Sequence, residues 1–424
     1  MSWSRFGPAL QERDYRLWWL ALLGMELSLQ ALEVAIGWEV YANQRSVLDL
    51  GWIGLAEFLP MFLLALPAGH LADRFPRRVV FAGSLLLGAA VGVGLALVSG
   101  ADTHSVWPYL ALALGAGTSM AIGTPAARAM PPTLVSAELL PSAMTLRSIA
   151  TQAGQVVGPA LGGLLYGFSP SLVYLLAAGS CFIAALAVVA MHPRPAADAA
   201  VDDDGAPSTA ASLTSVFEGL RFVRRTHVLL GAILLDLLAV LFGGAVALLP
   251  VFARSYLHVG PTGLGLLRAA PAVGALLAAA VLTRRPLGGR AGRTLLIVVG
   301  LYGASMVVFG LSRTFVLSLA ALGVSGFVDL FSMNIRATTV ALATPDRLRG
   351  RVNAVEMVFI SASNQLGAFE SGLAAFLFGT IPAVVGGGLI TIAIAASWGR
   401  LFPELAQVDH LEELKPAEGV TVPA

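Results

Sequence analysis

The sequence predicts an all-α membrane protein in which twelve transmembrane helices form two pseudo-symmetric six-helix bundles. The first observation is composition: 57% of the 424 residues are hydrophobic and 12% are charged, whereas a soluble domain is about 25% charged. The second is length, because the apolar segments accommodate about twelve helices of the roughly 20 residues that a bilayer requires. The third is a weak internal repeat. With a mean hydropathy of +0.80, the chain is expected to expose its apolar surface to lipid.

Hydropathy and turn residues place each span in order. The predicted spans are 17–40, 50–71, 79–99, 106–131, 142–167 and 170–191, followed by 228–253, 262–283, 294–311, 314–341, 351–378 and 381–401. The chain then divides into a first bundle at 1–192, a cytoplasmic linker at 193–227, a second bundle at 228–402 and a cytoplasmic tail at 403–424. We expect the first span to be retained, because no small-residue cleavage site follows it.

The end of the linker has an amphipathic pattern. Its apolar residues recur at helical spacing and lie opposite Glu218 and three arginines. These apolar residues are Leu213, Val216, Phe217, Leu220 and Val223. The pattern predicts a short helix on the membrane surface.

Basic residues predict the orientation, since they concentrate in cytoplasmic loops. With the N-terminus inside, 19 of the 26 basic residues fall in cytoplasmic segments and three fall outside. Both termini are therefore predicted to be cytoplasmic. The net charge of +1 gives no indication of a nucleic-acid partner.

Two short matches indicate that the six-helix unit is duplicated. The segment 128–138 aligns with 336–346 at an offset of 208, and 54–60 aligns with 265–271 at an offset of 211. Parallel repeats of this kind place a substrate path at the interface between the halves.

A loop with one carboxylate among three guanidiniums follows the second span. Its sequence is Gly-His-Leu-Ala-Asp-Arg-Phe-Pro-Arg-Arg at 69–78, and guanidiniums pair with carboxylates bidentately. The loop resembles the signature loop of the major facilitator superfamily, with Pro76 in place of the usual glycine. The resemblance implies a cytoplasmic gate made by Gly69, Asp73, Arg74, Arg77 and Arg78. The bias of cytoplasmic loops toward positive charge would by itself explain the three arginines. In the second half of the chain, Arg284 stands at the position equivalent to Asp73.

The fifth span carries glycines at spacings that let helices approach closely. The pattern consists of Gly154, Gly158, Pro159, Gly162 and Gly163. It resembles the motif of proton-coupled antiporters in the same superfamily, although Thr145 replaces the upstream glycine. Ordinary helix packing would give the same pattern.

The fourth span lacks the R-x-x-Q-G pattern of many drug antiporters and instead reads Gly-Thr-Pro-Ala-Ala-Arg at 123–128, followed by Pro131 and Pro132. Together with Phe-Leu-Pro at 58–60, this is similar to the drug:proton antiporter branch that contains the macrolide-efflux proteins and the enterobactin exporter. The resemblance covers nearly the whole chain and is more specific for fold than for substrate.

Polar and ionisable residues inside the spans are the strongest functional signal, because each is costly in hydrocarbon. Glu26, Gln30 and Glu33 share one face of the first span, and Asp236 and Asp329 lie in the seventh and tenth. The resemblance implies that the first, fourth, seventh and tenth spans line a central cavity, where a carboxyl group can exchange a proton. A structural pair or an interhelical hydrogen bond is the alternative for any one of them.

Other charged residues are candidates for gating. Glu57 and Arg268 occupy matching positions of the second and eighth spans, near the outer face. Arg128, Arg336 and Glu370 lie within or at the ends of other spans. Packing hydrogen bonds are an equal alternative for Glu57, Arg268 and Glu370.

No catalytic motif accompanies these charges: His-Glu-x-x-His, Gly-x-Ser-x-Gly and Gly-x4-Gly-Lys do not occur. The single cysteine excludes disulfides within the chain. We therefore predict no enzyme, cofactor or metal site. The predicted function is secondary active export of a small amphipathic molecule, drug-like or siderophore-like, across the bacterial inner membrane by proton antiport with alternating access.

The expected partners are this small-molecule substrate, protons and the lipid bilayer, and the protein is expected to be a monomer. An importer, or a mover of lipid-like substrates with the same fold, is the nearest alternative. An intramembrane enzyme or a membrane sensor is the alternative from a different class. The missing catalytic motifs weigh against the enzyme, and the absence of a soluble domain weighs against the sensor.

Overall fold

The structure is a computed structural model that describes residues 7–101, 103, 105–192, 213–284 and 289–409. For 65–73, 213–217, 347 and 361 it describes the backbone alone. Within these ranges the chain is helical and contains no strand, which confirms the all-α prediction. Most of the predicted linker, at 193–212, and the tail beyond 409 lie outside the described residues.

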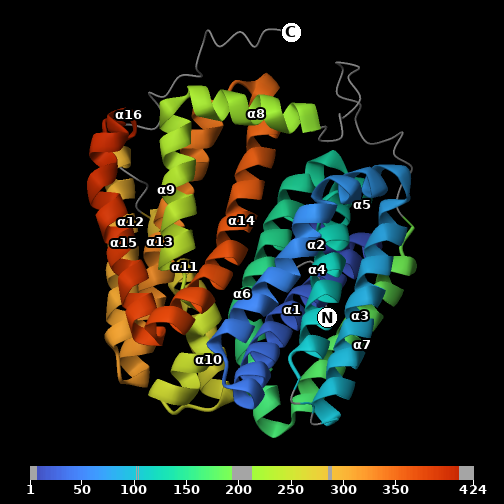
Figure 1. The fold of residues 1–424 in the computed structure, drawn as a ribbon. Helices are drawn as coiled ribbons and strands as arrows, with labels where there is room; N and C mark the ends of the chain where they lie inside the picture. The colour runs from blue at the N-terminus through green and yellow to red at the C-terminus, as the bar shows by residue number, and fades with distance from the viewer. Residues whose placement is uncertain (1–6, 102, 104, 193–212, 285–288, 410–424) are drawn as a thin grey trace. The chain divides into compact units, whose positions relative to one another are not determined.

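Long helices account for most of the first half of the chain (Figure 1). They are α1 (Arg13–Gln44), α2 (Val47–Arg74), α3 (Arg77–Gly100), α4 (Trp107–Arg128), α6 (Leu140–Phe168) and α7 (Pro170–Val189), with the short η2 (Pro8–Gln11), α5 (Pro131–Leu134) and η3 (Ala137–Leu139) between or before them. Prolines mark several starts: Pro76 immediately precedes α3, and Pro170 opens α7. Proline suits a first helical turn, because the backbone N–H groups of that turn have no acceptor within the helix and proline lacks this group.

The second half has the same arrangement of long helices. They are α9 (His227–Gly243), α11 (Pro261–Arg284), α12 (Ala291–Leu311), α13 (Phe315–Ala343), α14 (Asp346–Phe378) and α15 (Thr380–Leu401), with α8 (Leu213–Arg225) before them and α16 (Pro403–Ala406) after them. Between α9 and α11 the chain forms η5 (Val246–Leu248), α10 (Leu249–Val251) and the π-helical turn η6 (Phe252–Tyr256). The seventh span is therefore broken after Gly243, where Gly244 is extended.

Ten helices in the described residues are long and apolar enough to cross a membrane. Two predicted spans, 142–167 and 351–378, fall on α6 and α14, which are not among the ten. The reason lies in their sequences: α6 has an arginine and several hydroxyl and amide side chains, and α14 begins with a run of charged residues. Multiple spanning helices make the chain a multi-pass membrane protein.

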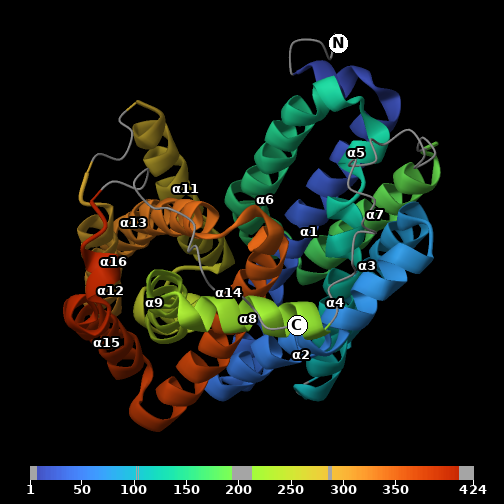
Figure 2. The same ribbon diagram turned by 90° about the horizontal axis from the view of Figure 1, so that it is seen from above.

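The helices pack in the same pairs in both halves of the chain. In the first half α1 packs against α6 and α7, while α3 packs against α4 and α7, and α1 lies between α6 and α7 in Figure 2. In the second half α9 packs against α14 and α15, while α12 packs against α13 and α15. When the long helices are numbered in order within each half, the same pairs are in contact in both halves. A duplicated six-helix unit requires this relation.

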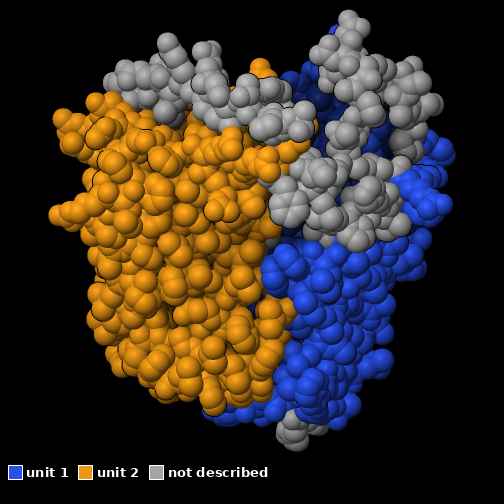
Figure 3. All heavy atoms as spheres, turned by 45° about the horizontal axis from the view of Figure 1, so that its top comes forward, with its two compact units in different colours: residues 1–45, 56–210, 260–269 blue, residues 46–55, 211–259, 270–424 orange. Residues whose placement is uncertain are grey.

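The chain separates into two compact units, coloured in Figure 3. Unit 1 comprises Met1–Arg45, Ala56–Ala210 and Gly260–Ala269, and unit 2 comprises Ser46–Leu55, Ala211–Val259 and Ala270–Ala424. Compared with the predicted bundles, residues 46–55 belong to unit 2 and residues 260–269 belong to unit 1. Glycine contacts explain this assignment: Gly265 of α11 contacts Gly163 of α6 in unit 1, and Gly51 of α2 contacts Gly372 of α14 in unit 2.

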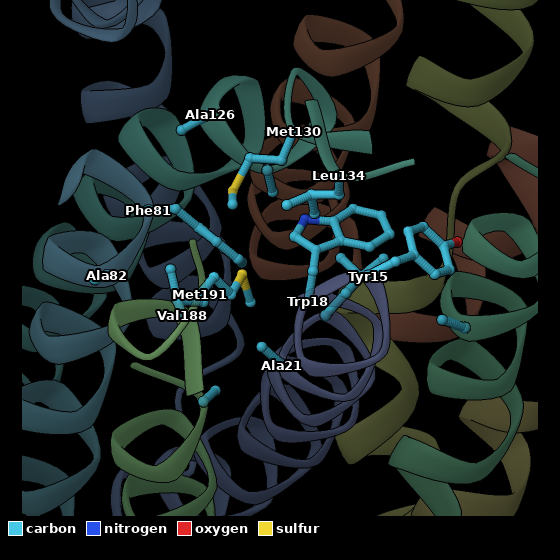
Figure 4. Close-up of a cluster of buried hydrophobic side chains, with 14 of the residues drawn as sticks. Tyr15, Trp18, Ala21, Phe81, Ala82, Ala126, Met130, Leu134, Val188 and Met191 are labelled. Atoms are coloured by element: carbon cyan, nitrogen blue, oxygen red, sulfur yellow. The ribbon is translucent and has the colours of Figure 1, made fainter. Parts of the chain in front are cut away.

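A buried apolar cluster holds one end of unit 1 together (Figure 4). Tyr15 and Trp18 of α1 are fully buried, beside Phe81 of α3 and Met130. The hydroxyl of Tyr15 donates a hydrogen bond of 2.6 Å to the carbonyl of Ala143 on α6. Aromatic side chains with a polar tip suit such positions, because the ring is buried and the hydroxyl finds an acceptor. The cluster fixes the position of α1, which carries the polar residues described next.

In unit 2, α8 runs across the ends of α9 and α14 (Figure 1). Phe222 and Val223 are each 1% exposed, whereas Arg221, Arg224 and Arg225 are exposed. Glu218 forms an ion pair with Arg351 of α14. The helix is therefore attached to its unit by an apolar face and one ion pair, and its arginines point away from that face.

Candidate functional site

The predicted polar face of α1 lies against the predicted antiporter-like motif of α6. A Cβ atom placed on Gly154 would lie 2.6 Å from the Cβ of Glu26, and one placed on Gly158 would lie 2.6 Å from the Cβ of Gln30. The Glu26 carboxylate also accepts a hydrogen bond of 3.3 Å from the hydroxyl of Thr151 on α6. Because these approaches exclude any side chain at the two glycines, the motif brings the α6 backbone directly onto the acidic face of α1.

The remaining motif residues contact two different helices. Gly162 contacts the backbone of Ala31 on α1, whereas Gly163 contacts the N-terminal turns of α11. The carbonyl of Pro159 lies against Gly265 of α11, where a Cβ atom would collide with it. The fifth predicted span therefore packs closely on α1 with one face and on α11 with another.

Glu33 forms an ion pair with Arg268 of α11, with both side chains about one-fifth exposed. Glu57 of α2 interacts electrostatically with both Glu33 and Arg268. The sequence placed Glu57 and Arg268 at matching positions as gating candidates, and in the structure the ion-pair partner of Arg268 is Glu33. The physical reason is helix geometry, since the packing of α6 on both α1 and α11 brings Glu33 to the guanidinium. The result is a cluster of two carboxylates around one guanidinium, which we call the Glu33 cluster.

A second charged cluster in unit 1 joins α1, α4 and α6. Arg128, at the end of α4, interacts electrostatically with Glu26 of α1 and with Arg147 of α6. Glu26 is half-buried. One carboxylate therefore lies near two guanidiniums, so that the group of three carries an excess positive charge.

The corresponding cluster in unit 2 is centred on Arg336 of α13, which is 5% exposed. Its guanidinium forms an ion pair with Asp236 of α9 and a second one with Glu356 of α14, whose oxygen lies 3.4 Å from Nε. Asp329, two turns before Arg336 on α13, interacts electrostatically with both Asp236 and Arg336. A guanidinium buried this deeply requires such partners, because an unpaired charge in the interior is strongly destabilising.

These two clusters occupy repeat-related positions. Glu26 and Asp236 are 210 residues apart, Arg128 and Arg336 are 208 apart, and Arg147 and Glu356 are 209 apart, close to the offsets of the sequence repeat. The third member is a cation in unit 1 and an anion in unit 2. The sequence repeat already aligned Arg128 with Arg336, but it did not relate Glu26 to Asp236 or Arg147 to Glu356, which the same offset would have done.

Sequence reasoning missed a buried carboxylate in unit 1. Glu39 of α1 is 4% exposed and accepts hydrogen bonds from the hydroxyls of Tyr109 on α4, at 2.7 Å, and Tyr174 on α7, at 2.5 Å. The partners are 70 and 135 residues away in sequence, so no local spacing indicates them. The only available signal was a glutamate in an apolar span.

The cytoplasmic loop motif is described only in part. Gly69 and Asp73 lie in α2, and the structure does not describe the side chain of Asp73, so its expected charge pairing lies outside the described residues. Arg77 donates a hydrogen bond of 2.9 Å to the carbonyl of Ala129 after α4, and Arg78 donates one to the carbonyl of Met191 after α7. Arg74 is exposed. The two arginines at the start of α3 thus hold the ends of neighbouring helices.

Glu370, the last predicted gating residue, is half-buried on α14 and forms a side-chain hydrogen bond with Ser371. The Ser371 hydroxyl in turn lies 2.6 Å from the carbonyl of Gly244, at the break after α9. Among the side chains that the structure describes, no group of three or more His, Cys, Asp or Glu residues is arranged to hold a metal ion.

The fold and these sites define a class of protein: a multi-pass helical membrane protein with an internal repeat and ionisable side chains clustered inside its spans. The chain also matches a family model described as "Transmembrane secretion effector" over residues 3–418. Among curated proteins, it is 27% identical over 388 residues to the enterobactin exporter EntS of Citrobacter koseri, covering 90% of each chain. It is 26% identical over 410 residues to the enterobactin exporter EntS of Escherichia coli K12, covering 95% of this chain and 94% of the exporter.

Solved structures show the same fold at low identity. A bacterial homologue of the human lysosomal transporter Spinster, in an inward-facing and unoccupied conformation, aligns with a TM-score of 0.70 at 16% identity, covering 92% of this chain and 98% of that one. A point mutant of the nucleoside transporter NupG aligns with a TM-score of 0.71 at 14% identity, covering 93% of this chain and 99% of that one.

The chain therefore belongs to the family of transmembrane secretion effectors, within the major facilitator superfamily. It is a membrane transporter and not an enzyme. The predicted resemblance to this superfamily and to the enterobactin exporter is confirmed.

Proposed function

We propose that this protein is a secondary active exporter that moves a small amphipathic molecule, drug-like or siderophore-like, across a bacterial inner membrane in exchange for protons. The match to the family over residues 3–418 and the enterobactin exporters among the relatives support export of a small molecule. Proton exchange and alternating access rest on the charge clusters inside the spans. We propose that the protein works as a monomer.

The proposed topology has twelve spans and two cytoplasmic termini. Ten candidate spans and the two further long helices α6 and α14 support this number. Arginine and lysine occur in 19 cytoplasmic and three external positions in this orientation, which is the bias expected of inside loops. The exposed arginines of α8 suit a helix at the cytoplasmic membrane surface, where headgroups are anionic.

The Glu33 cluster is the observation that carries the proposed proton coupling. Glu33 and Glu57 lie around one guanidinium, that of Arg268. With both carboxyl groups ionised the cluster has a net negative charge, which is costly inside a bilayer. Binding of one proton makes the cluster neutral, and its release to an aqueous face restores the charge. A site with one carboxylate more than it has cations can therefore take up and release the ion that antiport requires.

Further polar residues lie on the same face of α1 as Glu33. Glu26, Gln30 and Glu33 follow one another at helical spacing, and Gly154 and Gly158 bring the α6 backbone onto the first two. We propose that α6 slides on α1 here during alternating access, because a glycine surface has no side chains to interlock. Glu26 is the secondary candidate for a proton carrier.

The Arg128 and Arg336 clusters and the cytoplasmic loop motif are proposed to control access. The Arg336 cluster joins α9, α13 and α14 through a buried charge that is costly to leave unpaired. The Arg128 cluster places Arg128 near Glu26 and Arg147. Asp236 and Asp329 are further candidates for proton exchange, since both lie near Arg336. Asp73, with Gly69, Arg74, Arg77 and Arg78, is proposed as the gate that the family loop implies, and Glu370 is proposed as a gating residue of α14.

Transport into proteoliposomes under a controlled pH gradient tests this function. The probes are enterobactin, erythromycin and ethidium, each measured with a pH gradient of either sign and with none. We expect at least one probe to move against its own gradient only when protons can move the opposite way. Uptake that depends on the probe gradient alone would refute antiport, and accumulation in the same direction as the protons would favour the importer.

A further inference from the structure

A cavity of about 220 Å³ lies inside unit 2 at the break after α9. Its walls come from the end of α9 and η5, and from α11, α12, α13 and α14. Most of its lining is apolar, including Val240, Met306 and Leu322. Its polar side chains include Tyr302, Asp329 and Asn364.

The cavity exists because the seventh span is interrupted. α9 ends at Gly243 and Gly244 is extended, and the residues from Gly244 to Ala247 that follow the break line the cavity. The interrupted segment is held from α14, where the Ser371 hydroxyl donates a hydrogen bond of 2.6 Å to the Gly244 carbonyl. Gly367 packs close to the end of α9, since a Cβ there would lie 3.1 Å from the Val240 carbonyl oxygen. The break is thus fixed by specific contacts.

The charge of the cavity is set by Asp329. This residue lies in the middle of α13, yet its side chain is exposed, because it borders the cavity. Among the residues that the structure describes, Asp329 forms no ion pair, and the nearby guanidinium of Arg336 forms its ion pairs with Asp236 and Glu356. The described residues that border the cavity include no basic side chain. A carboxylate without a matched cation therefore borders a mostly apolar space.

We propose that this cavity binds the cationic end of a small organic ammonium compound, with Asp329 as its counter-ion and Tyr302 as an aromatic contact. Aromatic rings attract ammonium groups through their faces, most strongly where water is excluded. The apolar walls suit the substituents of the nitrogen. The proposal deepens the proposed function by naming a substrate class, and it rests on that function only for the step from binding to export.

Size and ligand chemistry favour an organic cation over a metal ion. An apolar cavity of about 150 Å³ holds benzene, so the volume of 220 Å³ suits an ammonium head with one ring, and any longer tail would extend out of it. A calcium ion takes about six to eight oxygen ligands. The cavity offers one carboxylate, one amide and a few hydroxyl and backbone oxygens, and its walls are otherwise apolar.

Equilibrium binding to the full-length protein in nanodiscs tests the proposal without any transport step. The probe is radiolabelled benzyltrimethylammonium, and the competitors are benzyl alcohol, which is neutral, and phenylacetate, which is an anion. We expect saturable binding that neither competitor displaces at equal concentration. Asp329→Asn should weaken binding at least tenfold, and Asp329→Glu should retain most of it. The matched control Glu404→Gln, which removes an exposed carboxylate of unit 2 outside the cavity, should leave binding unchanged.

Met306→Trp supplies a second variant that fills the cavity without changing its charge, and it should also abolish binding. No saturable binding to the wild-type protein, equal affinity in Asp329→Asn, or displacement by benzyl alcohol as effective as by the unlabelled cation would each overturn the proposal. If Asp329→Asn does not fold, the competitor series on the wild type and the Met306→Trp variant decide the question. Failure here leaves proton-driven export untouched, because the assay contains no gradient.

Discussion

Glu39 shows how a single residue can join three helices of unit 1. Glu39 belongs to α1. Its buried carboxylate accepts one hydrogen bond from the hydroxyl of Tyr109 on α4 and another from that of Tyr174 on α7. Hydrogen bonds to a charged acceptor are about twice as strong as neutral ones. The cost of such a site appears when one partner is removed, because a buried polar group without a partner bears its full desolvation penalty.

We predict that Glu39→Leu destabilises the protein by roughly 2–5 kcal/mol, since it leaves the hydroxyls of Tyr109 and Tyr174 without their acceptor. Glu39→Gln should cost less, because its amide oxygen still accepts one hydrogen bond. The measurement is thermal unfolding of the purified protein in detergent. Glu138→Gln removes an exposed carboxyl of the same unit and is the control. Equal unfolding temperatures for Glu39→Leu and the control would show that the contact is not structural.

The Glu33 cluster makes a prediction about which carboxylate is the partner of Arg268. Arg268→Gln should reduce transport, because it leaves the carboxylates of Glu33 and Glu57 inside a span without their cation. The exchange Glu33→Arg with Arg268→Glu should restore part of the activity, since it keeps opposite charges at the same two positions. The exchange Glu57→Arg with Arg268→Glu is the matched comparison and should not. Rescue by the second exchange alone would identify Glu57 as the partner, and transport rates in proteoliposomes decide between them.

At the residue scale, the sequence identified candidate charged residues inside the spans but did not show how they pair. Pairing depends on the rotation and depth of neighbouring helices, and hydropathy contains neither. Arg268 could face Glu57, Glu33 or both until the approach of α6 to α11 is known. Glu39 was missed for the same reason, because its partners are distant in sequence and a tyrosine in a span is not unusual.

At the scale of elements, glycine positions decide which helices touch. Gly162 of α6 lies against the backbone of Ala31, and a Cβ there would lie 2.6 Å from the Ala31 Cα atom. A Cβ placed on Gly179 of α7 would have no neighbouring atom within 4 Å. Both glycines lie inside helices, where alanine has the higher intrinsic helix propensity by about 1 kcal/mol. Alanine substitutions at Gly162 and Gly179 therefore distinguish the effect of helix packing from that of helix propensity.

We predict that Gly162→Ala lowers the unfolding temperature and the transport rate, because α1 and α6 must move apart to admit the methyl group. Gly179→Ala should be neutral or slightly stabilising, since it gains helix propensity and meets no neighbour. The same thermal unfolding assay measures both variants. A Gly162→Ala protein as stable and as active as the Gly179→Ala protein would mean that the close approach of α1 and α6 is not required.

Most helices could be predicted from hydropathy, and the exceptions have physical causes. The segments 142–167 and 351–378 were predicted as spans despite their polar residues, and both are long helices. The break after Gly243 was not predicted, because the sequence from 228 to 253 is almost continuously apolar and two adjacent glycines do not by themselves end a helix. Only the structure shows that α14 holds the interrupted backbone, through Ser371.

At the scale of the whole molecule, the repeat explains both the symmetry and the difference between the halves. The packing pairs of α1, α3, α4, α6 and α7 recur in α9, α12, α13, α14 and α15. The charge clusters also recur, but the third member is Arg147 in one and Glu356 in the other. The fold was predictable because hydropathy and family motifs extend over the whole chain. The substrate was not, because it depends on cavity shape and on a few side chains.

Proton movement coupled to transport tests the proposed mechanism most directly. Proteoliposomes containing the pH-sensitive dye pyranine receive an enterobactin gradient, and the internal pH is followed for the wild type, Glu33→Gln, Glu57→Gln and the exposed control Glu138→Gln. Proton exchange at the Glu33 cluster predicts that the wild type and the control move protons opposite to the substrate. It also predicts that at least one of the two cluster variants still exchanges substrate but moves no protons. Unchanged proton movement in both single variants and in the double variant would contradict the assignment of the coupled proton to Glu33 and Glu57.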